Sequence, residues 1–125
     1  MRTILILLCV ILMTGCSNDD PGATEVNIRL SNVSAFNFES IVVNTSTGLV
    51  NFENIGSGEK TTYKTFEKAY RYAFVELEIE GETYTLQPFD YVGEELLKNG
   101  NYTYQIDADI SQDQYGSLSL TLVKD

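Results

Sequence analysis

The sequence predicts an all-β protein, an antiparallel two-sheet β-sandwich of seven or eight strands with at most one short helical turn. Three observations support this class. Apolar and polar side chains alternate along most of the chain after Glu25, which is the pattern of a half-buried strand. Glycine and asparagine interrupt the alternation at short intervals. Eight tyrosines and six phenylalanines supply enough bulk for a packed core.

The first part of the chain predicts strands separated by turns. Residues 26–30 alternate cleanly and form the first strand. In residues 36–43 the apolar parity changes near residues 39–40, so a single strand there requires a bulge. Residues 44–48 have turn composition, and residues 49–55 form a short strand that a Gly-Ser-Gly sequence ends.

The middle of the chain contains the clearest strand. Residues 60–66 alternate weakly, whereas residues 73–79 place apolar side chains on one face and mostly acidic ones on the other. Residues 80–82, Glu-Gly-Glu, predict a hairpin turn. Residues 83–87 then return as its second strand.

The last part of the chain predicts two more strands after a long connection. Residues 88–99 lack a strand pattern and allow one helical turn over residues 93–98. Residues 102–108 alternate again, residues 111–116 form a loop, and three alternating leucines define a last strand over residues 118–122. Seven or eight strands in about 100 residues, separated by turns, are typical of a two-sheet sandwich.

Residues 97–104 carry a structural resemblance. Their sequence, Leu-Lys-Asn-Gly-Asn-Tyr-Thr-Tyr, places a leucine and a glycine turn before a tyrosine that opens a strand. This arrangement resembles the corner of immunoglobulin-like and prealbumin-like sandwiches, in which a tyrosine hydroxyl binds upstream backbone. The resemblance implies a sandwich of one of these two kinds and does not choose between them.

The N-terminus differs in kind from the rest of the chain. One positive charge, Arg2, precedes an unbroken apolar run from Ile4 to Met13. This run is too short for a transmembrane helix, which needs about 20 residues. It has the length and the charged flank of a secretory signal peptide, so we expect residues 1–15 to be removed.

The end of this segment resembles a bacterial lipobox. Thr14 and Gly15 are small residues directly before Cys16, and Met13 stands where leucine is usual. The resemblance implies that Cys16 carries diacylglycerol and that the mature chain begins there. An ordinary signal peptide followed by an incidental cysteine is the alternative. Two or more acyl chains, at ~0.8 kcal/mol per buried CH₂ group, anchor a protein stably in a membrane.

Residues 17–20, Ser-Asn-Asp-Asp, are similar to the acidic export signal of Bacteroidetes-type surface lipoproteins. The resemblance implies a lipid anchor in the outer membrane, with the protein facing the cell exterior. A plain solvated linker on a periplasm-facing anchor is the alternative. The expected organisation is therefore a signal peptide (1–15), a lipidated and acidic tether (16–24) and a single sandwich domain (25–125).

Cysteine usage and charge restrict the partners. Cys9 leaves with the signal peptide and Cys16 carries the lipid, so we expect a mature domain without a disulfide. Loss of Arg2 leaves seven basic against 18 acidic residues. Such a chain repels nucleic acid and anionic headgroups, so the membrane contact has to come from the lipid.

The composition argues against an enzyme. The chain contains no histidine, which excludes Ser-His and Cys-His catalysis and imidazole metal ligation. Glu94 and Glu95 are adjacent and do not flank a common bond. Residues 107–113 alternate oxygen-bearing side chains as a calcium loop does, but lack its glycine and its final glutamate. We therefore expect no catalytic residue, no metal and no cofactor.

Aromatic residues in two connections are the best candidates for binding. These residues precede the strongest strand or lie in the long connection, where binding residues of a rigid sandwich tend to occur. Tyrosine, phenylalanine and arginine suit sugar stacking and protein hot spots. The competing interpretation is that the aromatics fill the open ends of the sandwich. The candidates are Tyr70, Arg71, Tyr72, Phe89, Asp90 and Tyr91.

These observations predict a non-enzymatic cell-envelope lipoprotein that serves as an accessory or protein-interaction module. A direct carbohydrate-binding or adhesion module of a glycan-uptake system is the alternative. The first predicts an exposed apolar or edge-strand surface. The second predicts two or more exposed, coplanar aromatic rings in one groove.

Overall fold

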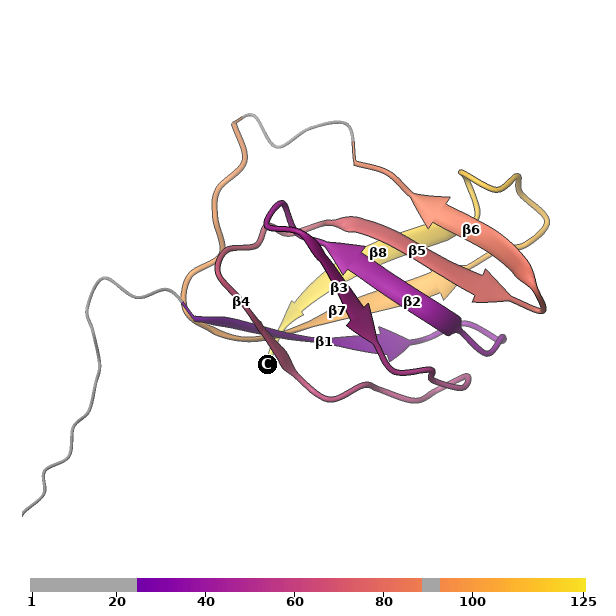
Figure 1. The fold of residues 1–125 in the computed structure, drawn as a ribbon, viewed down its shortest axis with the longest axis horizontal. Helices are drawn as coiled ribbons and strands as arrows, with labels where there is room; N and C mark the ends of the chain where they lie inside the picture. Colours follow the sequence, from indigo (N-terminus) through magenta and orange to yellow (C-terminus); the bar gives the residue numbers. More distant parts are fainter. Residues whose placement is uncertain (1–24, 89–92) are drawn as a thin grey trace, which may run out of the picture.

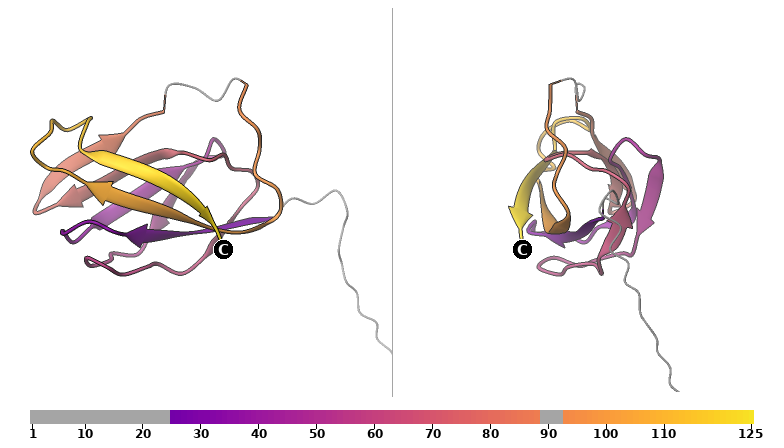
Figure 2. Two further views of the ribbon diagram at one scale, coloured as in Figure 1. Left: turned by 180° about the vertical axis from the view of Figure 1, so that it is seen from behind. Right: turned by 90° about the vertical axis from the view of Figure 1, so that its left-hand side faces the viewer.

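A computed structural model describes residues 25–88 and 93–125 and confirms the two-sheet β-sandwich. The described residues contain strands and no helix. The two sheets face each other across the core (Figures 1 and 2). The strands are β1 (Val26–Asn32), β2 (Glu39–Asn44), β3 (Leu49–Phe52), β4 (Lys64–Phe66), β5 (Phe74–Ile79), β6 (Glu82–Leu86), β7 (Gly100–Ala108) and β8 (Leu118–Lys124).

Strand pairing departs from the antiparallel expectation at one place. One sheet has the order β3-β2-β5-β6 and is antiparallel throughout. The other has the order β4-β1-β7-β8, and its central pair, β1 and β7, is parallel. The expectation fails there because β1 pairs with a strand that begins 74 positions after its own first residue, where no hairpin constrains direction.

The core consists of the alternating positions on the inner faces of both sheets, as the period-two pattern predicts. These side chains are at most 1% exposed. They include Val26, Ile28, Leu30, Ile41, Val43, Val75, Leu77, Ile79, Tyr104 and Ile106.

The bulge expected near residues 39–40 is present. The register between β2 and β5 shifts between Glu39 and Val42, and Ser40 has a φ of 51°. One extra residue returns the following apolar side chains to the core. The predicted hairpin is confirmed too, because Glu80 (φ 52°) and Gly81 (φ 82°) connect the paired residues Ile79 and Glu82. Positive φ at both central positions defines a type I′ turn.

The tyrosine corner forms as the resemblance implies. The Tyr102 hydroxyl donates to the Lys98 carbonyl oxygen at 2.8 Å. The allowed helical turn over residues 93–98 is absent, and the chain there is irregular. Instead, the Leu97 amide donates to the Ala69 carbonyl oxygen at 2.9 Å, which holds this segment against the β4–β5 connection.

The strands predicted at residues 49–55 and 60–66 are shorter in the structure, where they are β3 and β4. The reason is that the chain crosses from one sheet to the other between them. Residues 53–63 form this crossing, with single bridges at Ile55 to Phe38 and at Lys60 to Ser31. Phe52 and Phe66, at the ends of β3 and β4, stack with ring centroids 6.2 Å apart. The stack and the buried Ile55 close this side of the sandwich.

Candidate functional site

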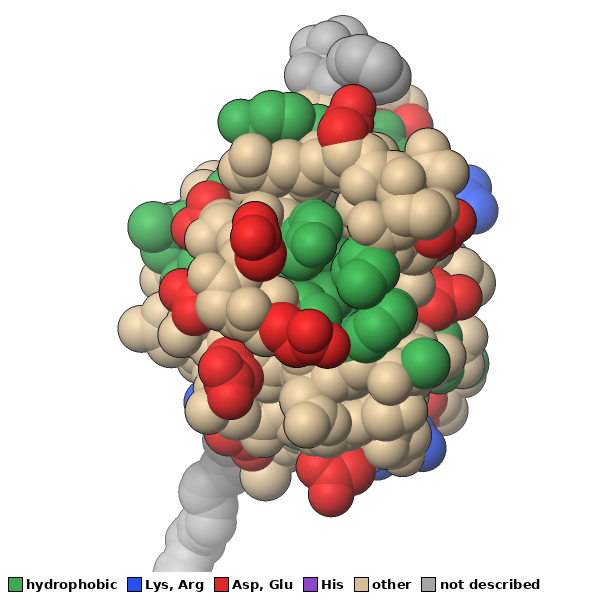
Figure 3. All heavy atoms as spheres, turned by 90° about the vertical axis from the view of Figure 1, so that its right-hand side faces the viewer, with side chains coloured by type: hydrophobic (Ala, Val, Ile, Leu, Met, Phe, Trp, Pro, Cys, Tyr) green, Lys and Arg blue, Asp and Glu red, His purple; other side chains and the backbone are tan. Residues whose placement is uncertain are grey.

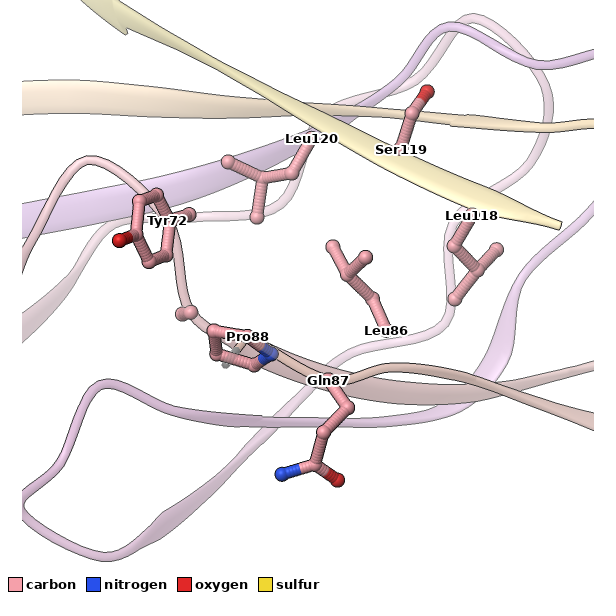
Figure 4. Close-up of a pocket in the computed structure, with 8 residues that line it drawn as sticks. Tyr72, Leu86, Gln87, Pro88, Leu118, Ser119 and Leu120 are labelled. Atoms are coloured by element: carbon pink, nitrogen blue, oxygen red, sulfur yellow. The ribbon is translucent and has the colours of Figure 1, made fainter. Parts of the chain in front are cut away.

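The opposite side of the sandwich contains an apolar groove. It lies between β6 and β8, which are edge strands of different sheets. Its volume is about 480 Å³. In Figure 4, Tyr72, Leu86, Leu118 and Leu120 turn toward one space, whereas Gln87 and Ser119 point away from it. The groove is lined by Tyr72, Ala73, Leu86, Gln87, Pro88, Leu118, Ser119 and Leu120.

The groove exists because the two sheets have no strand in common on this side. β6 pairs only with β5, and β8 only with β7, so each has an edge that faces the other without forming a ladder. The Thr85 amide donates to the Gln114 carbonyl oxygen at 3.1 Å. This bond ties β6 to the β7–β8 connection and delimits one end of the groove.

The chemistry of the groove is that of apolar contact. Among the described residues that line it, none is Asp, Glu, Lys or Arg. Leu118 is 5% exposed, whereas Leu86 and Leu120 are half-buried at the opening. Gln87 and Ser119, whose side chains point away from the apolar space, lie at the rim. Such a surface accepts apolar side chains or an extended chain.

The three predicted binding residues that the structure describes, Tyr70, Arg71 and Tyr72, have different surroundings. Tyr72 lines the groove and is half-buried. Arg71, the next residue back, lines a different hollow of about 420 Å³ formed with residues 93–98, Tyr102 and Leu122. The carbonyl of Tyr70 accepts a hydrogen bond from the buried Tyr104 at 2.6 Å. The backbone of Tyr70 therefore holds this connection against β7.

Phe89, Asp90 and Tyr91 lie outside the described residues, as do residues 1–24, for which the sequence predicts a signal peptide, lipidated Cys16 and an acidic tether. The leucines of β6 and β8 were not predicted as binding residues, because their alternation predicts core positions. The signal for a groove is the location of these leucines on two edge strands, which the sequence pattern does not reveal.

Two titratable groups with shifted pKa values, Tyr63 and Asp125, form a cluster outside the groove lining. Tyr63 donates to the Asp125 carboxylate, which also accepts from Thr103 at 2.7 Å and faces Arg29 Nε at 3.6 Å. Burial acts to raise the pKa of Asp125, but these hydrogen bonds and the charge of Arg29 hold it below its usual value. The hydrogen bond to Asp125 raises the pKa of Tyr63. This cluster fastens the end of the chain to β7 and is structural in character.

Among residues 25–88 and 93–125, no three acidic, cysteine or histidine side chains are placed to hold a metal ion. The same residues form no helix that is long and apolar enough to cross a bilayer.

Comparison with known proteins supports the fold alone. No protein-family model matches the chain, and no curated protein matches it. Among solved structures, the chain is similar to the NMR structure of a protein from Eubacterium rectale, with a TM-score of 0.51 and 18% identity. The alignment covers 86% of this chain and 94% of the other.

Proposed function

We propose that this chain is a non-enzymatic bacterial lipoprotein, anchored in the outer membrane through Cys16 and facing the cell exterior, whose sandwich binds a protein partner. The anchor rests on the lipobox resemblance and the acidic residues that follow it. The interaction role rests on the β6–β8 groove. It follows that the lipid holds the domain at the membrane and the sandwich supplies the recognition.

The groove is the observation that carries the interaction role. An exposed apolar surface beside strand edges costs free energy in water and favours association with a partner. The opposite side of the same sandwich is closed by the Phe52–Phe66 stack, so an open side is not a general consequence of this fold. An extended partner segment would place apolar side chains among the leucines and its backbone along an edge.

A protein partner fits the groove better than a sugar. Sugar rings stack on exposed, coplanar aromatic side chains. Of the described residues that line the groove, Tyr72 alone is aromatic, and it is half-buried. The apolar leucine walls instead match the side chains of a polypeptide.

Photocrosslinking in the native cells tests this function. A photoreactive residue replaces Gln87 in the full lipoprotein, at the rim of the groove. The matched control replaces Asn51, an exposed residue of β3, the edge strand on the closed side. We expect a discrete protein adduct from position 87, none from position 51, and loss of the adduct when Leu120→Asn makes the groove wall polar.

A polysaccharide adduct at position 87 would refute the protein-interaction role and support the alternative, a carbohydrate-binding module. No adduct of either kind would refute binding at the groove. Circular dichroism of the Leu120→Asn protein distinguishes loss of binding from loss of fold.

A further inference from the structure

The end of the sandwich farthest from Glu25 has a distinct surface. Strands β1, β5 and β7 end there, and β2, β6 and β8 begin there (Figure 1). Apolar side chains occupy the centre of this end, acidic side chains surround them, and Lys and Arg are confined to the margins (Figure 3). Residues 33–39, 78–82 and 105–117, which contribute to this end, contain no Lys or Arg, whereas the neighbouring crossing of residues 53–63, whose Ser57 amide donates to Asn37 Oδ1, contains Lys60.

The apolar part of this surface lies on connections that hold it in place. Val33 in the β1–β2 connection is 49% exposed, and Ile110 in the β7–β8 connection is 38% exposed. Phe36, also in the β1–β2 connection, is half-buried against the core. Asn32, which is fully buried, donates from Nδ2 to the Phe36 carbonyl oxygen at 2.6 Å. Its Oδ1 accepts from the Ser34 hydroxyl at 2.6 Å. The loop that presents Phe36 is therefore preorganised, which lowers the entropy cost of binding.

A hollow of about 250 Å³ joins the apolar centre to the acidic rim. It is lined by Ala35, Phe36, Asn37, Glu39 and Glu80. Asn37 Oδ1 accepts from the Ser57 amide at 3.3 Å, which steadies one wall. The hollow therefore combines an aromatic ring and a methyl group with two carboxylates from different loops.

The carboxylates around this hollow are not balanced by positive charge. Glu39 lies directly opposite Glu78 across the β2–β5 pair, an arrangement of like charges that destabilises a sheet. Glu80 occupies a position with φ 52°, which a glutamate adopts only at a cost in free energy. Within residues 25–88 and 93–125 the ion pair found joins Arg29 to Asp125, away from this end. A cation supplied from outside would relieve the repulsion.

We propose that this end docks a protein partner that inserts a Lys or Arg side chain into the hollow, with apolar residues around it. The alkyl stem of the inserted side chain packs against Ala35 and Phe36, and its cation meets the carboxylates of Glu39 and Glu80. The apolar neighbours cover Val33 and Ile110. The inference rests on the proposed function, under which the anchor precedes Glu25 and this end points away from the membrane.

Charge selects a basic protein over other occupants. An anionic ligand, nucleic acid or an anionic membrane is repelled by the acidic rim. A basic side chain with a long alkyl stem satisfies the apolar floor and the carboxylates together. Opposite charges across an interface also steer association, so binding should weaken as salt rises.

The test places a photoreactive residue at Ala35, which is exposed and lines the hollow, in the full lipoprotein in its own cells. Mass spectrometry then identifies the crosslinked partner peptide. We expect a peptide that contains Lys or Arg among apolar residues. In the Glu39→Gln/Glu80→Gln double variant the adduct yield should fall about 10-fold or more, as for loss of a close charge pair.

Two matched variants make the result specific. Glu25→Gln/Glu67→Gln removes two exposed carboxylates near the opposite end and should leave the adduct unchanged. Glu80→Lys should abolish the adduct, and exchange of the partner's basic residue for glutamate should restore it. An adduct that persists in the Glu39→Gln/Glu80→Gln variant overturns the inference, as does a crosslinked peptide without Lys or Arg.

The two proposals fail differently. A protein adduct from position 87 without one from position 35 overturns the docking inference alone. The absence of a protein adduct from both positions overturns the interaction function together with it.

Discussion

Removal of one buried hydroxyl should measure how strongly the β4–β5 connection is held to the core. Tyr104 is fully buried, and its hydroxyl donates to the Tyr70 carbonyl oxygen at 2.6 Å. Tyr104→Phe keeps the ring and its packing but removes this hydrogen bond. Removal of one partner of a buried hydrogen bond costs about 1–3 kcal/mol. In a domain of this size, each kcal/mol lowers Tm by about 4–8 °C.

Urea and thermal unfolding followed by circular dichroism provide the assay. We expect Tyr104→Phe to lower the free energy of unfolding by about 1–3 kcal/mol, with an unchanged m-value. The matched control is Tyr115→Phe, because Tyr115 is 68% exposed and its hydroxyl is accessible to water in the folded protein. Equal midpoints for the two variants would refute the structural role of the Tyr104 hydroxyl.

Three further outcomes are expected. Phe52→Ala, which removes one ring of the stack that closes the sandwich, should destabilise the domain by about 3–5 kcal/mol in urea unfolding. The pKa of Asp125 is lowered in the folded state, so the folded protein binds fewer protons than the unfolded protein just below pH 4. The ionised carboxylate therefore stabilises the fold above that range, and this stabilisation is lost as pH falls through the lowered pKa. The free energy of unfolding of Asp125→Asn should lack this part of the pH dependence, and parallel pH profiles for the variant and the wild-type protein would contradict the role of the cluster. Cys16→Ala should move the protein from the membrane fraction to the soluble fraction, and retention in membranes would show that lipidation at Cys16 is wrong.

Part of the candidate site could be predicted from the sequence. The position of Tyr72 before the strongest strand identified a residue of the groove, because the connections of a sandwich gather at its ends and edges. The two preceding residues have other surroundings. The Tyr70 carbonyl accepts a hydrogen bond from Tyr104 of β7, and Arg71 lines a separate hollow. Adjacent residues in an irregular segment point in directions that only their tertiary contacts decide.

The local features of this protein follow from short stretches of its sequence. Alternation identified the strands, the parity change at residues 39–40 indicated the bulge, and Glu80-Gly81 indicated the hairpin. The tyrosine corner at Tyr102 was likewise visible in a few consecutive residues. These features depend on neighbours in the chain, through the period of two and the conformational demands of a turn.

Which strands lie at the edges of the sheets, and which loops lie side by side, depends on long-range strand pairing. In the orders β4-β1-β7-β8 and β3-β2-β5-β6, both β8 and β6 are edge strands. Leucines of these strands, for which the alternation predicts core positions, therefore line a groove. Glu39 and Glu80 share a hollow because β2 pairs with β5, which leads directly into the turn that contains Glu80. Side-chain periodicity specifies the face on which a residue lies, whereas long-range pairing specifies its neighbours, and it is the neighbours that make a site.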